Sequence, residues 1–305
     1  MSDDARLAQI IATYGRQFDL RLDDGRTVRG RSRGRRLQPV CGDRVRATPL
    51  PNEPEWLIET VEPRGTALTR PDRSGRTEIL AANVDLVAVV AAPMPPPDWF
   101  VVDRYLCAAE LVGSDAAVVF NKTDLGPIPE STEAALAEYA AIGYPVLRLS
   151  ARQDAGLAAL RDLLGGHMAV IVGQSGVGKS SLINALFGDE VLPTGAVSNK
   201  RREGRHTTVN TVMRMLPHAG AVIDSPGVRD YAPAIDTPAE VTRGFREIRA
   251  AARHCRFADC AHLREPDCKV IEGVGQGSIG ARRYESYRRM YRVSQKLAER
   301  TPGRK

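Results

Sequence analysis

One eight-residue stretch constrains the fold of this chain more than any other part of its sequence. Residues 173–180 read Gly-Gln-Ser-Gly-Val-Gly-Lys-Ser, which is the spacing of a phosphate-binding P-loop. The apolar residues 168–172 before it are typical of a buried strand, and residues 181–187 after it are typical of a helix. The alternative is an ordinary glycine-rich turn, which does not require a buried strand before it and a helix after it. The stretch therefore predicts an α/β domain with a parallel sheet.

The residues of this loop have different expected roles. The glycines let backbone N–H groups converge on phosphate oxygens, Lys179 reaches the β and γ oxygens, and Ser180 ligates Mg²⁺. We also expect Lys179 to be a catalytic residue. The residues expected to contact the nucleotide here are Gly173, Gln174, Ser175, Gly176, Val177, Gly178, Lys179, Ser180 and Ser181.

The rest of the central sequence agrees with a parallel sheet. Further apolar runs of strand length lie at residues 84–91, 116–120, 146–149 and 221–223. Helical patterns at residues 131–142 and 156–164 separate several of them. Buried strands that alternate with helices predict a parallel sheet covered on both faces.

Two polar segments follow predicted strands and favour guanine as the base. Asn121-Lys122-Thr123-Asp124 follows residues 116–120, and Ser150-Ala151 follows residues 146–149. The Asp124 carboxylate can accept both N–H groups on one edge of guanine, an edge that adenine lacks. We expect Asn121 on the other side of the base, the Lys122 stem over its face, and a backbone N–H of Ser150 or Ala151 at the guanine O6. Such a polar turn often only starts a helix, but beside a P-loop it favours GTP over ATP.

Magnesium and the γ-phosphate have further candidate ligands. Asp224 ends the strand at 221–223 and is placed to hold Mg²⁺ through water, and the N–H of Gly227 can sense the γ-phosphate. Residues 204–208, Gly-Arg-His-Thr-Thr, offer one of their two threonines, Thr207 by preference, as a further Mg²⁺ ligand, although they could be a plain surface loop. Many GTPases place a water-orienting glutamine where this chain has Val228. His206 is the local substitute, unless it is an ordinary loop histidine, and intrinsic turnover should be slow.

The order of these motifs along the chain is unusual. Standard GTPases run from the P-loop through the switch threonine and Asp-x-x-Gly to Asn-Lys-x-Asp and Ser-Ala. Here the last two motifs precede the P-loop. Because each motif follows the carboxyl end of a parallel strand, all of them still meet at one edge of the sheet. The sequence thus predicts a circular permutation, which surface termini tolerate.

The segment before this domain predicts a small barrel. Residues 17–22 alternate like a strand, residues 23–25 read as a turn into a second strand, and residues 40–45 and 56–61 look like two more. Short strands with frequent turns suggest a barrel.

Charge is concentrated at both ends of the chain. The 305 residues carry a net charge of +6, with six arginines in residues 26–36 and nine Lys or Arg in residues 282–305. We therefore expect a nucleic acid as partner, the alternative being a solvated basic surface. No apolar run reaches the roughly 18 residues that cross a bilayer, and the acidic start is unlike a secretory signal. We expect a cytoplasmic protein with no membrane partner.

The C-terminal part contains a candidate metal site. Cys255, Cys260, His262 and Cys268 offer three thiolates and one imidazole, a set that suits tetrahedral, structural Zn²⁺. His254 is a rival ligand, although its neighbour Cys255 makes joint binding awkward. Cys41 and Cys107 stand alone and are expected to be buried.

With rotated motifs, a barrel-like start and a Cys₃His end, the chain resembles the RsgA family of circularly permuted GTPases over nearly its whole length. The shared features include Gly42-Asp43-Arg44-Val45, the Gly-Arg-His-Thr-Thr segment, and Cys255-Arg256-Phe257-Ala258-Asp259-Cys260. The resemblance implies GTP hydrolysis stimulated by the small ribosomal subunit, a checking role late in its maturation, and rRNA as partner. It also implies three domains: an OB-fold in residues 1–66, the permuted GTPase in 67–236, and a helical zinc domain in 237–305. We expect a monomer whose nucleotide state controls association with the subunit and release from it.

Two other functions are compatible with parts of the sequence. One is a non-enzymatic RNA-binding protein that holds GTP structurally, which the complete P-loop and the Thr-rich segment disfavour. The other is a metal-handling GTPase, for which one closed Cys₃His site is poor support. Finally, residues 231–237 form a short link containing Pro233, and Pro238 follows it. We expect this link to couple the nucleotide to the orientation of the zinc domain.

Overall fold

The computed structural model describes residues 5–34, 37–71, 77–188, 211–217, 219–224 and 237–300. The expectations for His206, Thr207, Gly227 and Val228 lie outside these residues, as does most of the 231–237 link. No helix within the described ranges is both long and apolar enough to cross a membrane.

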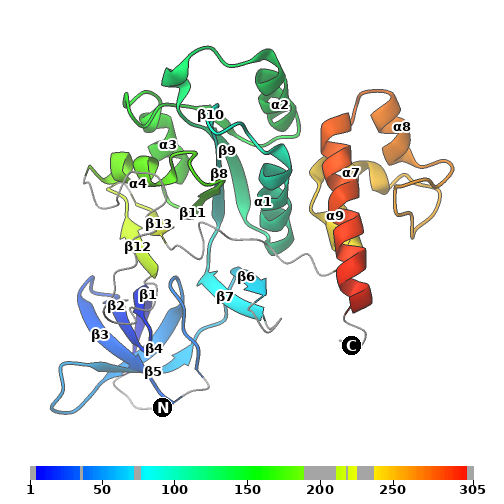
Figure 1. Cartoon of the computed structure of the whole chain (residues 1–305). Coiled ribbons are helices and arrows are strands. Elements are labelled where there is room, and N and C mark those ends of the chain that lie inside the picture. Colours follow the sequence, from blue (N-terminus) through cyan, green and yellow to red (C-terminus); the bar gives the residue numbers. More distant parts are fainter. Residues whose placement is uncertain are drawn as a thin grey trace.

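Within the described residues, eleven strands form one continuous sheet that runs from the central part into the N-terminal strands (Figure 1). Its order is β10-β9-β8-β11-β13-β12-β1-β2-β3-β5-β4, and β6 with β7 forms a separate two-stranded sheet. The strands are β1 Arg6–Tyr14, β2 Gln17–Leu22, β3 Thr27–Ser32, β4 Arg44–Pro49, β5 Trp56–Val61, β6 Ala67–Pro71, β7 Thr77–Ala82, β8 Leu86–Ala91, β9 Asp115–Phe120, β10 Val146–Arg148, β11 Met168–Gly173, β12 Thr211–Met215 and β13 Ala221–Asp224.

The central part is the expected parallel sheet. Strands β10, β9, β8, β11 and β13 are parallel neighbours, and β12 is antiparallel to β13. All six residues of β8 are buried, because helices cover both faces of the sheet. The helical segments of this part are α1 Trp99–Val112, the 3-10 helix η1 Thr123–Leu125, α2 Glu130–Ala141, α3 Leu157–Leu164 and α4 Lys179–Phe187.

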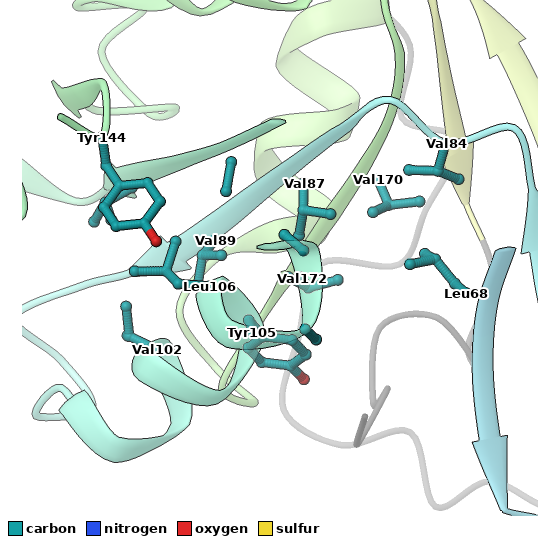
Figure 2. Packing of buried hydrophobic residues seen from close by; sticks show 14 of the residues in the cluster. Leu68, Val84, Val87, Val89, Val102, Tyr105, Leu106, Tyr144, Val170 and Val172 are labelled. Atoms are coloured by element: carbon teal, nitrogen blue, oxygen red, sulfur yellow. The ribbon is translucent and has the colours of Figure 1, made fainter. Parts of the chain in front are cut away.

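Two hydrophobic clusters hold these helices to the sheet. On one face, Tyr105 and Leu106 of α1 pack with valines of β8 and β11, as Figure 2 shows. On the other face, Leu160 of α3 and Leu182 of α4 belong to a second buried cluster. Apolar burial of this kind contributes about 25 cal/mol per Å² and accounts for most of the cohesion of the domain.

The N-terminal strands close into a barrel in the order β1-β2-β3-β5-β4-β1, with β3 and β5 parallel. This five-stranded arrangement is the OB-fold that was expected. The expected strands at residues 17–22 and 56–61 match β2 and β5. The expected strand at 40–45 is wrong in its first half, because Gly42 adopts a φ of 94° and the strand begins only at Arg44. The strand expectations also missed β1.

The C-terminal part is helical, with α6 Pro238–Arg243, α7 Arg246–Ala252, α8 Lys269–Gly275 and α9 Ala281–Arg300. A capping box between Thr237 and Glu240 starts α6. Phe245, Ile248, Val270 and Tyr287 belong to a third buried cluster, which also includes Cys107 of α1. The three-domain division at residues 66 and 236 remains a prediction.

Buried ion pairs attach these helices to α1 and α2. Arg283 of α9 is fully buried, and its guanidinium donates to Asp103 Oδ1 at 2.8 Å and to Glu247 Oε1 at 2.9 Å. Arg282 donates to the other Asp103 oxygen at 3.1 Å and to Glu138 Oε2 at 3.0 Å. Asp103, itself buried, also accepts from the Tyr139 hydroxyl at 2.6 Å. These two arginines, counted above within a basic tail, therefore bind carboxylates inside the protein.

Candidate functional site

The P-loop passes so close to its neighbours that two of its positions require glycine. Gly173 and Gly178 have φ angles of 141° and 97°, where side chains are strained. A Cβ on Gly173 would lie 2.2 Å from the carbonyl oxygen of Val90 on β8. A Cβ on Gly178 would lie 2.4 Å from the Asn121 Nδ2. The sequence pattern of the loop thus reflects its packing as well as its expected ligand.

Lys179 places its ammonium group inside the curve of the loop. The side chain is 8% exposed, and its Nζ donates to the carbonyl oxygens of Gly173 at 2.7 Å and Gln174 at 2.8 Å. The loop thus holds a positive charge beside backbone N–H groups at the start of α4, a combination that attracts phosphate. Ser180 and Ser181 follow in the first turn of α4 and are half-buried.

Asn121 joins three of the motifs. Its side chain is 1% exposed and donates through Nδ2 to the carbonyl oxygen of Val177 in the P-loop at 3.0 Å. Its Oδ1 accepts from the backbone N–H of Ala151 at 3.1 Å. The contacts of Asn121 and Ala151 in this structure therefore connect loops, while their contacts with the base remain predictions.

The expected guanine-recognition carboxylate is held in place by a neighbouring hydroxyl. Ser150 is fully buried, and its Oγ donates to Asp124 Oδ1 at 2.6 Å. Lys122 has a φ of 64° and donates from Nζ to Gly176 O at 2.6 Å and to Met94 O at 2.8 Å. Its stem therefore extends from the Asn-Lys-x-Asp segment toward the P-loop, and its place over the face of the base stays a prediction.

The loop between β8 and α1 also belongs to this site, which the sequence reasoning missed. This loop includes the proline-rich residues 93–97. The backbone N–H of Asp98 donates to Gln174 Oε1 of the P-loop at 2.8 Å, and Met94 accepts from Lys122. A position directly after a parallel strand of the same sheet was the signal that could have placed this loop here.

Asp224 ends β13, which lies beside the P-loop strand β11 in parallel register. Its side chain is half-buried. Asp224 therefore reaches the same sheet edge as the P-loop, as the permuted order of motifs predicted. The other expected Mg²⁺ and γ-phosphate groups, Thr207 and Gly227, lie outside the described residues.

The four expected metal ligands come together in the C-terminal part. The ligand atoms of Cys255, Cys260, His262 and Cys268 all lie within 4.8 Å of one another. The His262 Nδ1 is 3.5 Å from the sulfurs of both Cys255 and Cys268, and these sulfurs are 3.9 Å apart. Tetrahedral zinc has bonds of about 2.3 Å to sulfur and about 2.0 Å to nitrogen. These bond lengths require a separation of about 3.5 Å between a sulfur and the nitrogen and of about 3.8 Å between two sulfurs. The donor set fits zinc, and the rival ligand His254 is not part of it.

The backbone around this cluster is held by side chains outside it. Tyr284 and Tyr287 of α9 donate to the carbonyl oxygens of His262 at 2.7 Å and Ala261 at 2.8 Å. Burial lowers the pKa of His262, which favours the neutral imidazole. Cys41 and Cys107 are buried, as expected, and this burial raises the pKa of both thiols to about 12, which makes them unreactive.

A P-loop, a guanine-type Asn-Lys-x-Asp segment and a permuted strand order at one sheet edge define a circularly permuted P-loop GTPase. A family model described as RsgA GTPase matches residues 61–233. The chain belongs to this family and is a hydrolase that acts on GTP.

Relatives and solved structures agree with this assignment. The chain is 40% identical over 285 residues to the small ribosomal subunit biogenesis GTPase RsgA of Azotobacter vinelandii, covering 92% of this chain and 83% of that protein. It is 38% identical over 300 residues to the protein of the same name from Alcanivorax borkumensis, covering 95% and 84%. The crystal structure of YjeQ from Thermotoga maritima matches with a TM-score of 0.78 at 29% identity, covering 95% of this chain and 99% of that one. YloQ, a circularly permuted GTPase, shares the fold with a TM-score of 0.74 at 24% identity, covering 99% and 98%.

Proposed function

We propose that this GTPase binds the small ribosomal subunit and hydrolyses GTP to GDP and phosphate late in the maturation of that subunit. The nucleotide state of the GTPase would control its association with the subunit and its release from it. The names of its relatives support the ribosomal role. The observation that carries the GTPase part is the pair of bonds from Asn121 to the P-loop and to Ala151. These bonds assemble motifs that lie far apart in the chain into one site.

The geometry supports a division of roles among the described residues. Asp124, oriented by Ser150, would accept the N–H groups of guanine, and Lys122 would cover the face of the base. Lys179 would leave its two carbonyl acceptors for the β and γ oxygens of the nucleotide. Ser180 and Asp224 would hold Mg²⁺, which neutralises charge on the phosphates when bound.

The remaining catalytic roles rest on sequence alone. Thr207 would complete the Mg²⁺ shell, the N–H of Gly227 would sense the γ-phosphate, and His206 would position the attacking water. Because Val228 cannot orient water, we expect turnover by the protein alone to be slow.

The cysteine cluster would hold one structural Zn²⁺. Its three sulfurs and one nitrogen fill a tetrahedral shell, which leaves no open position for a substrate. The metal would hold the loops before and after Cys260 together. Zinc would therefore serve the shape of the C-terminal part, and a role in metal handling gains no support.

The proposed ribosomal contact uses rRNA and a positively charged surface. Arg26, Arg29 and Arg31 of the barrel form ion pairs with nearby carboxylates, but each remains about half-exposed. Exposed pairs of this kind are weak and exchange readily with phosphate. We also propose that the protein is a cytoplasmic monomer with the three domains 1–66, 67–236 and 237–305.

The decisive experiment measures GTP turnover with and without purified small ribosomal subunits. We expect slow turnover alone and a large stimulation by subunits, with none by free large subunits. A Lys179→Ala variant is the control, since it should be inactive under both conditions. Equal turnover with and without small subunits would contradict the ribosomal part of the proposal and leave the GTPase assignment intact.

A further inference from the structure

The first strand of the barrel is also a strand of the nucleotide-binding sheet. Residues Arg6 to Gln9 of β1 pair with β4 inside the barrel. Ala12 and Thr13 of the same strand pair instead with Val212 and Thr211 of β12. In Figure 1, β12 extends from the central sheet toward β1. The barrel is thus joined to the GTPase sheet by a strand pairing in addition to side-chain packing.

This pairing ends beside Asp224. Val212 is paired with Ala12 on one side and with Asp224 on the other. The three residues form a row across β1, β12 and β13, so that two strand spacings, or about 10 Å, separate the barrel from Asp224. A single paired residue, Val212, therefore lies between Ala12 and Asp224.

Only the end of β12 near Asp224 receives this support from the barrel. Thr211 is 9% exposed, whereas Met215 at the other end of β12 is 43% exposed. A strand at a sheet edge has one partner only and frays more readily than an inner strand. Through β1, the barrel converts the Thr211–Val212 end of β12 from an edge into an inner position.

A β-bulge lets β1 serve both sheets. The register with β2 shifts between Ile10 and Ala12, so that Ile11 is an extra residue. Ile10 is fully buried in the barrel core, but Ile11 packs against the hydrophobic cluster that lies under α1. Bulges redirect side chains in this manner, and the pairing with β12 begins directly after this one.

A second contact holds β1 at Ile10, directly before the bulge, whereas the pairing with β12 begins at Ala12, directly after it. Gly42 lies so close to the end of β7 that a Cβ would be 2.0 Å from the carbonyl oxygen of Ala82. The side chain of Asn83 donates to Gly42 O at 2.9 Å, and the N–H of Ala82 donates to Cys41 O at 3.0 Å. The N–H of Gly42 in turn donates to Ile10 O at 2.9 Å. The bulge of β1 is therefore held between this corner and β12.

We propose that β1 is a positioning element of the nucleotide site: Ile11 anchors the bulge, Ala12 and Thr13 hold β12, and β12 holds Asp224 where Mg²⁺ binds. This inference rests on the proposed role of Asp224 as a magnesium ligand.

The test compares nucleotide affinity in Mg²⁺ and in EDTA, using a fluorescent N-methylanthraniloyl derivative of GDP. The ratio of the two affinities isolates the magnesium contribution, and affinity in EDTA reports the P-loop and guanine contacts. We expect Ile11→Ala to reduce the ratio by about threefold or more, which is within the range of packing changes that couple sites. Affinity in EDTA should stay at the wild-type value, a separation that a general loss of stability would not produce.

Matched variants separate positioning from barrel stability. Leu7→Ala changes an exposed residue of the same strand, and Ile58→Val trims a fully buried residue of the barrel core on β5. Both variants should keep the wild-type ratio of nucleotide affinity in Mg²⁺ to nucleotide affinity in EDTA. Should Ile11→Ala fail to fold, Ile11→Val decides the matter, with a smaller reduction expected in the same direction.

Asp224→Asn distinguishes the inference from the function on which it rests. A lower ratio in Asp224→Asn together with a wild-type ratio in the folded Ile11 variant would overturn the positioning role and leave the magnesium assignment in place. A wild-type ratio in Asp224→Asn would overturn both. Lower ratios in Asp224→Asn and Ile11→Ala, with unchanged Leu7→Ala and Ile58→Val, would support the inference.

Discussion

Replacing Arg283 with methionine tests how firmly the C-terminal helices are attached to the GTPase sheet. Arg283 is fully buried and donates to Asp103 once and to Glu247 twice, at 2.8, 2.9 and 3.1 Å. Its guanidinium also lies 4.4 Å from the ring centroid of Phe245. Methionine has a similar volume and no charge, so that the variant removes the ion pairs while it leaves little space.

The expected loss follows from the partners that remain. Removing one member of a buried ion pair costs about 3–5 kcal/mol, because the other member is left buried and uncompensated. Asp103 keeps Arg282 at 3.1 Å and the Tyr139 hydroxyl, whereas Glu247 loses both of its bonds to Arg283. We therefore expect the lower end of that range, about 3 kcal/mol, which lowers a urea midpoint by about 1 M.

The sequence provides its own probe for this measurement. Trp56 and Trp99 are the two tryptophans, and Trp99 begins α1 with the Arg282 guanidinium 5.6 Å from its ring centroid. In a Trp56→Phe background, fluorescence in urea reports on Trp99, which lies between the core of the central sheet and this interface. Arg292→Met, an exposed arginine on the same helix, is the matched control and should change stability by less than about 0.5 kcal/mol. Equal midpoints for the Arg283 and Arg292 variants would refute the reasoning.

Four further predictions concern the ligands. Asp124→Asn should weaken GTP binding and favour xanthosine triphosphate, because an amide can donate where the carboxylate only accepts; an unchanged preference would count against guanine recognition by this residue. Lys179→Ala should weaken phosphate binding by about 2 kcal/mol, or roughly thirtyfold, and a wild-type affinity would contradict the P-loop role. Metal analysis should find about one Zn²⁺ per chain, and Cys260→Ser should lose it while GDP binding persists; a folded, metal-free wild type would end this idea. Binding to small subunits should weaken steeply with salt, whereas salt-independent binding would show that charge is incidental.

The local parts of the fold could be predicted because their causes are local. The apolar run of β8, the glycines of the P-loop and the spacing of Cys255 to Cys268 each indicate their own structure. The meeting of Asn121 with the P-loop followed from a rule of topology, since parallel strands end at one edge.

Features that depend on distant partners could not be predicted in this way. The charge of Arg282 and Arg283 is visible in the sequence, but their burial depends on Asp103, about 180 positions earlier. Deleting residues 281–305 to test the salt dependence would consequently remove part of the fold along with the charge. Likewise, nothing near residue 12 indicates that Ala12 pairs with Val212. Only the three-dimensional arrangement shows these contacts.

The place of β13 in the sheet has a consequence for folding during synthesis. As the chain is made from its N-terminus, β9 and β11 can each join a free edge of β8, and β10 can then join β9. By that time the barrel strands are complete, and β12 can extend them through β1. Of the described strands, β13 is the last to be made, and it fits between β11 and β12. It therefore joins two sheets formed earlier and delivers Asp224 in the same step. A nascent chain that has not yet made β13 can form the P-loop and the Asn-Lys-x-Asp segment, but Asp224, the carboxylate proposed to bind magnesium, is placed only when β13 joins the two parts into one sheet.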